Sequence, residues 1–222
     1  MNDYATTKAR VEHYFDRTAT RVWDRLTSDA PVSRIRQTVR EGRDRMRAIM
    51  LGQLPQDLSG CRVLDAGCGT GLMTAELAER GAEVVAVDIS PQLISIAEQR
   101  LDARLSSKVS FRSGDMTDPG LGAFDYVLAM DSMIYYRASD IADILDRLAA
   151  RTDHAVVFTV APRTPFLMTF FTVGKAFPRS DRSPTMIPHA FGDLRRRVGP
   201  GLDRVARVSR GFYISECLEF RP

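Results

Sequence analysis

The chain has few of the residues that build disulfide frameworks or metal centres. It contains only three cysteines and three histidines among 222 residues. They are scattered along the chain, at Cys61, Cys68, Cys217, His13, His154 and His189. These positions do not follow the short spacings of zinc ligands or of a secreted disulfide scaffold. We therefore expect no disulfides and no metal site built from protein side chains.

Long hydrophobic runs are absent as well. No stretch reaches the roughly 18 apolar residues that a membrane-spanning helix needs. The first residues, Met-Asn-Asp-Tyr-Ala-Thr-Thr, lack the apolar segment of a secretory signal peptide. The sequence therefore predicts a cytoplasmic protein with reduced cysteines.

Neither sign of charge dominates, because 31 basic residues stand against 28 acidic ones, a net charge of +3. The basic residues are nevertheless gathered outside the middle of the chain. Six arginines and two acids lie in residues 31–50, and ten basic residues and three acids lie in residues 163–210. Such flanks suit an anionic substrate, an anionic membrane surface or an acidic partner. For residues 34–47, a solvated helix face is an equally open interpretation.

What the chain does have is a regular alternation of apolar strands and amphipathic helices. Its length and its 44% apolar content fit one domain with embellishments. The pattern predicts strands at 61–66, 83–88, 109–112, 124–130 and 154–160, and helices at 71–80, 91–104 and 138–150. This order is typical of a doubly wound parallel sheet. Two further strands, 202–209 and 211–220, are expected to close it as an antiparallel hairpin, giving seven strands.

Two segments lie outside this alternation. Residues 1–55 are expected to form a helical cap, with one helix over 2–28 and a second from Val32 to Met50, across the mouth of a cleft. Residues 56–222 then form the sheet domain. Within it, 162–200 is an insertion rich in proline, with an apolar block at 166–173. This block is interpreted either as a half-exposed lid for a large flat ligand or as a core helix under the sheet.

The most informative stretch is Asp-Ala-Gly-Cys-Gly-Thr-Gly at residues 65–71. An apolar strand ends in Asp65, and glycines follow at 67, 69 and 71 before a helix begins. Glycine allows a tight turn and lets a ligand approach the main chain, and the helix N-terminus adds unpaired N–H donors. The spacing differs from the G-x-G-x-x-G pattern that binds a pyrophosphate. Cys68 is interpreted as a small filler within the turn rather than a nucleophile.

Three later strands also end in candidate ligands. The second strand closes in Asp88, Ile89 and Ser90, where an acid is placed to accept hydrogen bonds from ribose hydroxyls. Asp88 has an alternative as a helix cap, because Ser90-Pro91 is a good helix start. The third strand is followed by Gly114-Asp115-Met116, and the fourth ends at Met130-Asp131.

These four strand ends resemble the motifs of class I S-adenosylmethionine-dependent methyltransferases. The resemblance implies the seven-stranded Rossmann-like fold of those enzymes and S-adenosylmethionine (SAM) as cofactor. In it the glycine turn supports the methionine moiety, Asp88 binds the ribose, and Asp115 accepts the adenine amine. The implied cofactor-binding residues are Asp65, Gly67, Cys68, Gly69, Gly71, Asp88, Ile89, Ser90, Asp115, Met116 and Met130.

The acceptor is suggested by a second resemblance. Residues 14–18 (Tyr-Phe-Asp-Arg-Thr) to Trp23, and residues 32–43, are similar to the magnesium-protoporphyrin IX O-methyltransferase family of chlorophyll and bacteriochlorophyll synthesis. The resemblance implies methyl transfer to a propionate of Mg-protoporphyrin IX, with magnesium carried by the substrate. Tyr14 and Tyr135 are the implied catalytic residues, although Tyr14 is equally well interpreted as a packing residue of its helix. Implied substrate-binding residues are Trp23, Asp131, Arg163, Phe166 and Phe170.

One position departs from that family. Many members have Ile-His-Tyr after the fourth strand, where this chain has Ile134-Tyr135-Tyr136. A propionic acid has a pKa near that of Glu, about 4.3, so the acceptor is already an anion at neutral pH. Alignment of the carboxylate with the methyl group then supplies the catalysis, and no general base is required.

Other functions are less well supported. A nucleic-acid methyltransferase is not expected, because the chain lacks both Asn/Asp-Pro-Pro-Tyr after the fourth strand and a Pro-Cys nucleophile. Methylation of another apolar carboxylate or small molecule stays open. So does a porphyrin carrier that partners the porphyrin-binding subunit of magnesium chelatase, although the complete set of acids argues against an inactive site. Peripheral contact with the photosynthetic membrane is a further expectation.

Overall fold

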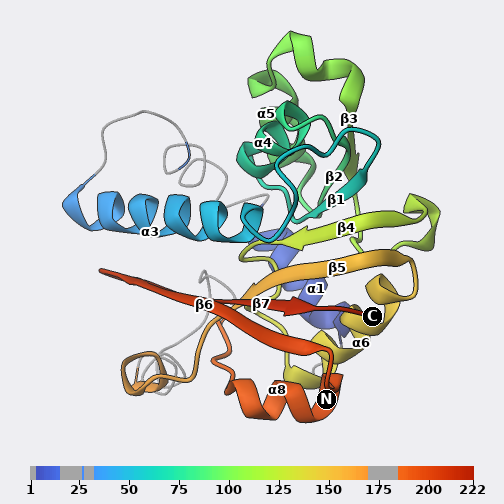
Figure 1. Ribbon diagram of the computed structural model, residues 1–222. Coiled ribbons are helices and arrows are strands. Elements are labelled where there is room, and N and C mark those ends of the chain that lie inside the picture. The colour runs from blue at the N-terminus through green and yellow to red at the C-terminus, as the bar shows by residue number, and fades with distance from the viewer. Residues whose placement is uncertain (1–3, 16–26, 28–32, 170–184) are drawn as a thin grey trace.

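The computed structural model describes residues 4–15, 27, 33–169 and 185–222 (Figure 1). A seven-stranded sheet runs through the molecule in the order β3-β2-β1-β4-β5-β7-β6. Its strands are β1 (Arg62–Ala66), β2 (Glu83–Asp88), β3 (Val109–Ser113), β4 (Phe124–Ala129), β5 (Thr152–Val160), β6 (Leu202–Arg210) and β7 (Tyr213–Phe220). The pairs among β1–β5 are parallel, and β7 is antiparallel to both of its neighbours, β5 and β6. The predicted fold class is confirmed.

Helices cover both faces of the sheet. One apolar cluster joins it to α3 (Arg34–Leu51), α4 (Leu72–Glu79) and α5 (Pro91–Arg100). A second cluster joins the other face to α6 (Ala138–Ala149) and α8 (Phe191–Val198), and Tyr4 of α1 (Tyr4–Tyr14) packs against it. Short 3-10 helices, η2 (Ala103–Lys108) and η3 (Pro119–Leu121), flank β3. Because the central strands are buried on both faces, they are continuous apolar runs in the sequence.

The ends of the helices follow from local chemistry. Ser90 caps α5 by accepting a hydrogen bond from the Leu93 amide at 3.3 Å, and Pro91 occupies the first turn, where no amide donor is needed. Ser33 caps α3 in the same way, through the amide of Arg36. The Ser90 cap places the start of α5 at the end of β2, directly beside Asp88.

Some predicted boundaries change. The expected helix over 2–28 contains α1, and residues 16–26 lie outside the described residues. The expected helix over 91–104 ends at Arg100, because Leu101 is extended and Asp102 caps η2. The 162–200 insertion holds α8, which packs on α6 and β6 with Leu194 fully buried. That part of the insertion therefore belongs to the body of the fold.

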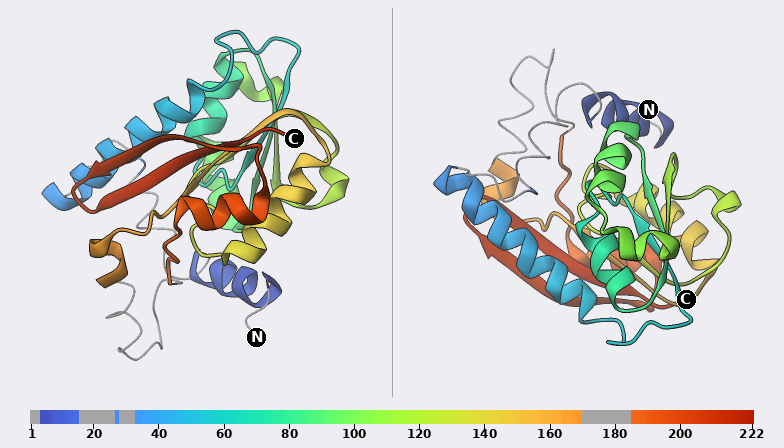
Figure 2. Two further views of the ribbon diagram at one scale, coloured as in Figure 1. Left: turned by 60° about the horizontal axis from the view of Figure 1, so that its bottom comes forward. Right: turned by 90° about the horizontal axis from the view of Figure 1, so that it is seen from above.

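Helix α3 lies along the β6–β7 hairpin, as both views in Figure 2 show. Two glycines allow the close approach. A Cβ on Gly42 would lie 2.7 Å from Cδ1 of Tyr213, and one on Gly211 would lie 2.2 Å from Oγ1 of Thr38. The contact brings the N-terminal cap against the last two strands of the chain. Within the described residues, no helix is long and apolar enough to cross a membrane.

Candidate active site

An open cavity lies at the carboxyl ends of β1, β2 and β4, where α/β sheets bind their ligands. Its empty volume, which includes open solvent at the mouth, is about 1070 Å³. Residues of helices α1 and α3 contribute to its lining. The lining residues are Tyr4, Lys8, Val11, Phe15, Thr27, Arg43, Arg47, Asp65, Gly67, Cys68, Gly69, Thr70, Leu72, Met73, Val87, Asp88, Ile89, Leu93, Gly114, Asp115, Met116, Met130, Asp131, Ser132, Tyr135 and Tyr136.

The glycine turn forms the floor of this cavity. Gly67, Gly69 and Gly71 have φ angles of 86°, 55° and 84°, in the left-handed region that favours glycine. The amide of Gly67 donates to the carbonyl of Val87 at 2.7 Å, which fixes the turn against β2. A Cβ on Gly67 would lie 2.5 Å from the Cβ of Ser132, so this glycine is also needed for space. Gly71 caps α4 and does not line the cavity.

Asp65, at the end of β1, is buried beneath the turn. Its Oδ2 accepts a hydrogen bond from Oγ1 of Thr74 at 2.6 Å. Burial raises the pKa of Asp65 to about 7, against the lowering effect of this bond. Burial also raises the pKa of the Cys68 thiol well above its usual value. A thiol with such a pKa is a poor nucleophile, consistent with Cys68 as a filler residue.

Asp88 joins the second strand to the glycine turn. Its Oδ2 accepts from the amide of Gly69 and its Oδ1 from the amide of Ser90, both at 2.9 Å. The helix-cap alternative is wrong for Asp88, because Ser90 is the residue that caps α5. Asp88 and Ile89 line the cavity, whereas Ser90 is fully buried behind it. The carboxylate is thus held at the cavity wall, and its contact with a ribose stays a prediction.

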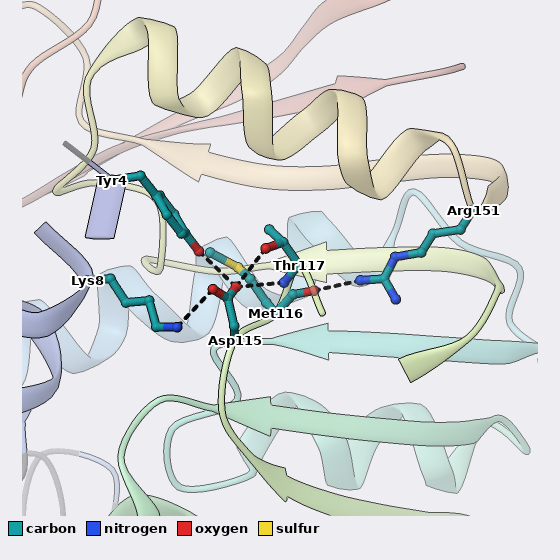
Figure 3. Close-up of polar contacts among 6 residues, drawn as sticks. All are labelled: Tyr4, Lys8, Asp115, Met116, Thr117 and Arg151. Carbon is teal, nitrogen blue, oxygen red and sulfur yellow. Dashed lines mark hydrogen bonds and ion pairs between the residues drawn. The ribbon is translucent and has the colours of Figure 1, made fainter. Parts of the chain in front are cut away.

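Asp115, after β3, is bound by side chains that the sequence did not indicate (Figure 3). Tyr4 Oη donates to Oδ1 at 2.8 Å and Lys8 Nζ to Oδ2 at 3.0 Å. The amide and the hydroxyl of Thr117 both donate to Oδ1 as well. Burial would raise the pKa of Asp115, but these hydrogen bonds outweigh it and lower the pKa. In this structure the carboxylate predicted to accept the adenine amine anchors helix α1.

Asp131 is the meeting point of four elements. Its φ of 54° is unusual for a residue with a side chain and costs of order 1–3 kcal/mol. Its carboxylate forms an ion pair with Arg43 of α3 and accepts from Tyr213 Oη of β7 at 3.1 Å. Oγ1 of Thr159, on β5, donates a hydrogen bond to the Asp131 carboxylate at 3.2 Å. The same Oγ1 accepts a hydrogen bond from the Asp131 amide at 2.7 Å. These bonds hold the end of β4 against α3 and the hairpin.

Two of these partners were missed by the sequence analysis. Arg43 stands within the arginine-rich segment, but no pattern separates it from its five neighbours in 31–50. Tyr213 lies in a strand at the opposite end of the chain and carries no motif. Only the packing of α3 on the hairpin brings both side chains to Asp131.

The two predicted catalytic tyrosines have different positions. Tyr135 is buried, lines the cavity and contacts the ring of Phe15 with a centroid distance of 6.4 Å. Tyr14 is half-buried against Phe15 and is not among the lining residues. The reason is helical phase. Tyr4, Lys8, Val11 and Phe15 follow each other at spacings of three and four, and Tyr14 falls beside this stripe.

The predicted substrate residues are only partly brought together. Asp131 lines the cavity, but Arg163 and Phe166 do not. Both lie exposed beyond β5, and Phe166 is 44% exposed in a short helix over 165–169. For Phe166 the core-helix interpretation is therefore wrong. Trp23 and Phe170 lie outside the described residues, as does the rest of the apolar block.

The cavity fits a nucleoside joined to an amino acid. Three features of its lining support this fit. The glycine turn offers main-chain groups, Asp88 is the acid predicted to bind a ribose, and Ile89 and Met116 are apolar. Oγ of Ser132 is buried at the cavity wall and has no hydrogen-bond partner among the described residues, which leaves a polar group for a ligand. Among the described residues there is no group of three His, Cys, Asp or Glu side chains that could hold a metal ion.

Two family models match the chain. The model described as a methyltransferase domain matches residues 63–153. The model described as the magnesium-protoporphyrin IX methyltransferase C-terminus matches residues 129–222. The first spans the glycine turn and the strand ends that follow it, and the second spans Asp131, the 162–200 insertion and the hairpin.

Individual proteins and a solved structure agree. The chain is 67% identical to the magnesium-protoporphyrin O-methyltransferase of Rhodobacter capsulatus, over all of this chain and 99% of that protein. It is 29% identical to the Synechocystis enzyme of the same name, over 96% of this chain and 95% of that protein. The crystal structure of the Synechocystis magnesium protoporphyrin IX methyltransferase with bound SAH superposes with a TM-score of 0.80, at 28% identity, covering 96% of this chain and 99% of the other.

A relative of such identity over the full length of both chains settles the classification. The structure adds the seven-stranded fold and a cavity at the strand ends that carry the methyltransferase motifs. The chain belongs to the magnesium-protoporphyrin O-methyltransferase family of SAM-dependent enzymes.

Proposed function

We propose that the chain transfers the methyl group of SAM to the carboxylate of a propionate side chain of Mg-protoporphyrin IX. The products are the monomethyl ester and S-adenosylhomocysteine. The observation that carries the proposal is the single cavity wall that joins the glycine turn, Asp88 and Tyr135 to the arginine-bearing helix α3. When bound, SAM supplies an activated methyl group on a sulfonium.

The residues of the chain have separate tasks in this reaction. The turn around Gly67 and Gly69 supports the methionine part, and Asp88 binds the ribose hydroxyls. Asp115 stands at the adenine end, where its bonds to Tyr4 and Lys8 attach helix α1. Tyr135, which lines the same cavity, is our candidate for orienting the acceptor oxygen.

No proton needs to be removed, because the propionate is ionised at neutral pH. Alignment of oxygen, methyl carbon and sulfur can contribute roughly 7–11 kcal/mol to catalysis. Many family members have a histidine where this chain has Tyr135. We therefore propose that Tyr135 positions the acceptor and does not act as a base. Loss of a general base at this place is not expected to abolish turnover.

The direct test is methyl transfer from isotopically labelled SAM to Mg-protoporphyrin IX and, in parallel, to metal-free protoporphyrin IX. We expect monomethyl ester from the magnesium form, identified by chromatography against a standard. Transfer to neither porphyrin would refute the assignment. Transfer to an unrelated apolar carboxylate at a higher kcat/KM would replace it with a different small-molecule methyltransferase.

We also propose that one end of the molecule contacts an anionic membrane surface, with the rest of the protein in the cytoplasm. Three large apolar side chains are exposed there, Ile35 of α3, Phe212 of the hairpin turn and Phe166. The rings of Phe166 and Phe212 lie 6.4 Å apart. Exposed arginines accompany them, namely Arg34, Arg36, Arg163 and Arg210. Apolar anchors beside cations suit an anionic bilayer.

Vesicle flotation tests this contact. Binding to vesicles with anionic lipid should be lost in the double variant Ile35→Ser with Phe212→Ser. The control is the same pair of proteins on neutral vesicles. Equal flotation of the parent and the double variant would contradict the proposed surface.

The porphyrin-binding subunit of magnesium chelatase is the partner that we propose for substrate delivery. Free Mg-protoporphyrin is poorly soluble and photoreactive, so direct transfer protects it. Pull-down of that subunit, with methyl transfer measured on the same samples, separates an enzyme that receives substrate from a carrier without activity. Capture without methyl transfer would favour the carrier.

A further inference from the structure

The acceptor brings a negative charge into a cavity that already holds four carboxylates. Three cations line it among the described residues, Lys8, Arg43 and Arg47. Lys8 is bound to Asp115 at the end of β3. Arg47 is bound to Glu76, on the helix that follows the glycine turn, and to Asp44. Arg43 is bound to Asp131 at the end of β4, on the same wall as Tyr135.

The surroundings of Arg43 set it apart from the other two cations. The next residue after Asp131 is Ser132, whose buried Oγ has no hydrogen-bond partner in the part of the chain that the structure describes and whose Cβ packs against Gly67. This corner therefore lies between the glycine turn and Tyr135, where donor and acceptor must meet. A carboxylate placed here would face one aspartate, so it needs a compensating cation.

The structure holds the Arg43 side chain through its ion pair with Asp131. Asp131 binds its Nη1, and Asp131 is itself fixed by Tyr213 Oη and Thr159 Oγ1. The close packing of Gly42 on the Tyr213 ring sets the position of α3 that makes this pairing possible. A guanidinium carries five N–H donors in a planar fork, which matches a carboxylate in two-point contact.

We propose that Arg43 binds the carboxylate of the acceptor and that Asp131 and Tyr213 are positioning residues that orient its guanidinium. This inference rests on the proposed function. It differs from the expectation that Asp131 itself contacts the substrate, because the carboxylates of Asp131 and of the acceptor would repel each other. The charges in this part of the cavity then cancel, because the positive charges of Arg43 and the sulfonium equal the negative charges of Asp131 and the acceptor carboxylate.

The test compares two ligands that differ only in their carboxylates, Mg-protoporphyrin IX and its dimethyl ester. The parent enzyme should bind the diacid at least about tenfold more tightly than the dimethyl ester, as a charge-assisted pair predicts. Arg43→Met should lose most of this discrimination and keep its affinity for S-adenosylhomocysteine within about twofold. Arg45→Gln, an exposed arginine on the same helix, is the matched control.

Two further variants test the positioning residue Tyr213 and the shape of the Arg43 side chain. Tyr213→Phe keeps the ring packed on Gly42 and removes only the hydroxyl, so KM for the porphyrin should rise with KM for SAM unchanged. Arg43→Lys keeps the charge without the fork and should fall between the parent and Arg43→Met. If Arg43→Met does not fold, Arg43→Lys still tests whether the guanidinium binds the acceptor carboxylate.

The outcomes separate the two levels of the proposal. If the parent enzyme neither binds nor methylates Mg-protoporphyrin, the proposed function fails. If the parent discriminates and Arg43→Met and Arg43→Lys discriminate equally well, the inference is overturned and the function stands. Loss of S-adenosylhomocysteine affinity with porphyrin binding unchanged would assign Arg43 to the cofactor and also overturn the inference.

Discussion

The two sides of the active-site cavity are built from different kinds of contact. On the cofactor side, comprising β1, β2 and the turns that follow them, partners are near in sequence. Asp65 and Thr74 are nine residues apart, and Gly69 and Asp88 are 19 apart. On the proposed acceptor side, comprising α3, the end of β4 and the β6–β7 hairpin, Arg43 and Tyr213 are 88 and 82 residues from Asp131. The contacts around the glycine turn are thus local in sequence, whereas the proposed acceptor site depends on tertiary packing.

The largest expected effect comes from breaking the cofactor side at Asp88. Asp88→Ala removes the acceptor for two main-chain amides and the group proposed to bind the ribose, each charged bond being worth about 1.5–3 kcal/mol. We expect the dissociation constant for S-adenosylhomocysteine to rise by about 100-fold or more, measured by titration calorimetry. Asp118→Ala, in the exposed turn at η3, is the control. An unchanged affinity in Asp88→Ala would show that the turn alone binds the cofactor.

A second variant breaks the junction between the two sides. Gly67→Ala places a Cβ against Ser132 at a φ of 86°. Strain and overpacking together should cost about 3 kcal/mol in the free energy of unfolding. The control is Gly60→Ala, which has a φ of 82° and no atom within 4 Å of the new Cβ. It should lose only about 1 kcal/mol, measured by urea denaturation. Equal losses of stability in the two variants would show that Ser132 moves to make room for the new Cβ.

The third prediction concerns the pH dependence of stability on the cofactor side. The pKa of Asp65 is raised to about 7 in the folded state, above its unfolded value, so its contribution to stability is full at low pH and falls as pH rises through 7. Between about pH 5.5 and about pH 8.5, the parent should lose roughly 2 kcal/mol relative to Asp65→Asn. Denaturation curves of both proteins across this range measure the difference. A constant difference would mean that Asp65 does not titrate there.

The smallest expected effect sharpens the acceptor side. Tyr135→Phe removes one hydroxyl from the cavity wall and should lower kcat by about five- to tenfold, the value of one hydrogen bond. Tyr14→Phe should remain close to the parent, because Tyr14 lies beside the stripe of α1 that lines the cavity. Steady-state kinetics with Mg-protoporphyrin IX compare the two. Unchanged kinetics for both would remove the tyrosines from the mechanism.

Much of the fold could be predicted because strands and helices follow local periodicity. The five parallel strands and the final hairpin agree with the prediction to within two residues at most ends. The glycine turn and Asp88 were also identifiable, since their residue types and spacing are fixed by local turn geometry. Their ligand contacts remain predictions.

The acceptor side could be predicted only in part. Arg163 and Phe166 were chosen from composition, but the direction in which the chain leaves β5 carries them away from the cavity. Arg43 and Tyr213 have no local signature, because each acquires its role through the approach of α3 to the hairpin. At the proposed adenine end of the cofactor site, Tyr4 and Lys8 were hidden for the same reason, since their partner Asp115 lies more than a hundred residues away.

The packing of α3 on the β6–β7 hairpin has a consequence for the order in which the chain folds. The helix is synthesised before β1, and its packing partners are the last two strands. Its apolar residues Met46 and Met50 are fully buried in the finished protein. In a nascent chain this helix must wait for the hairpin, whereas the turn around Gly67 already has β2 beside it. We expect the methyl donor site to form during synthesis and the acceptor site only once the chain is complete.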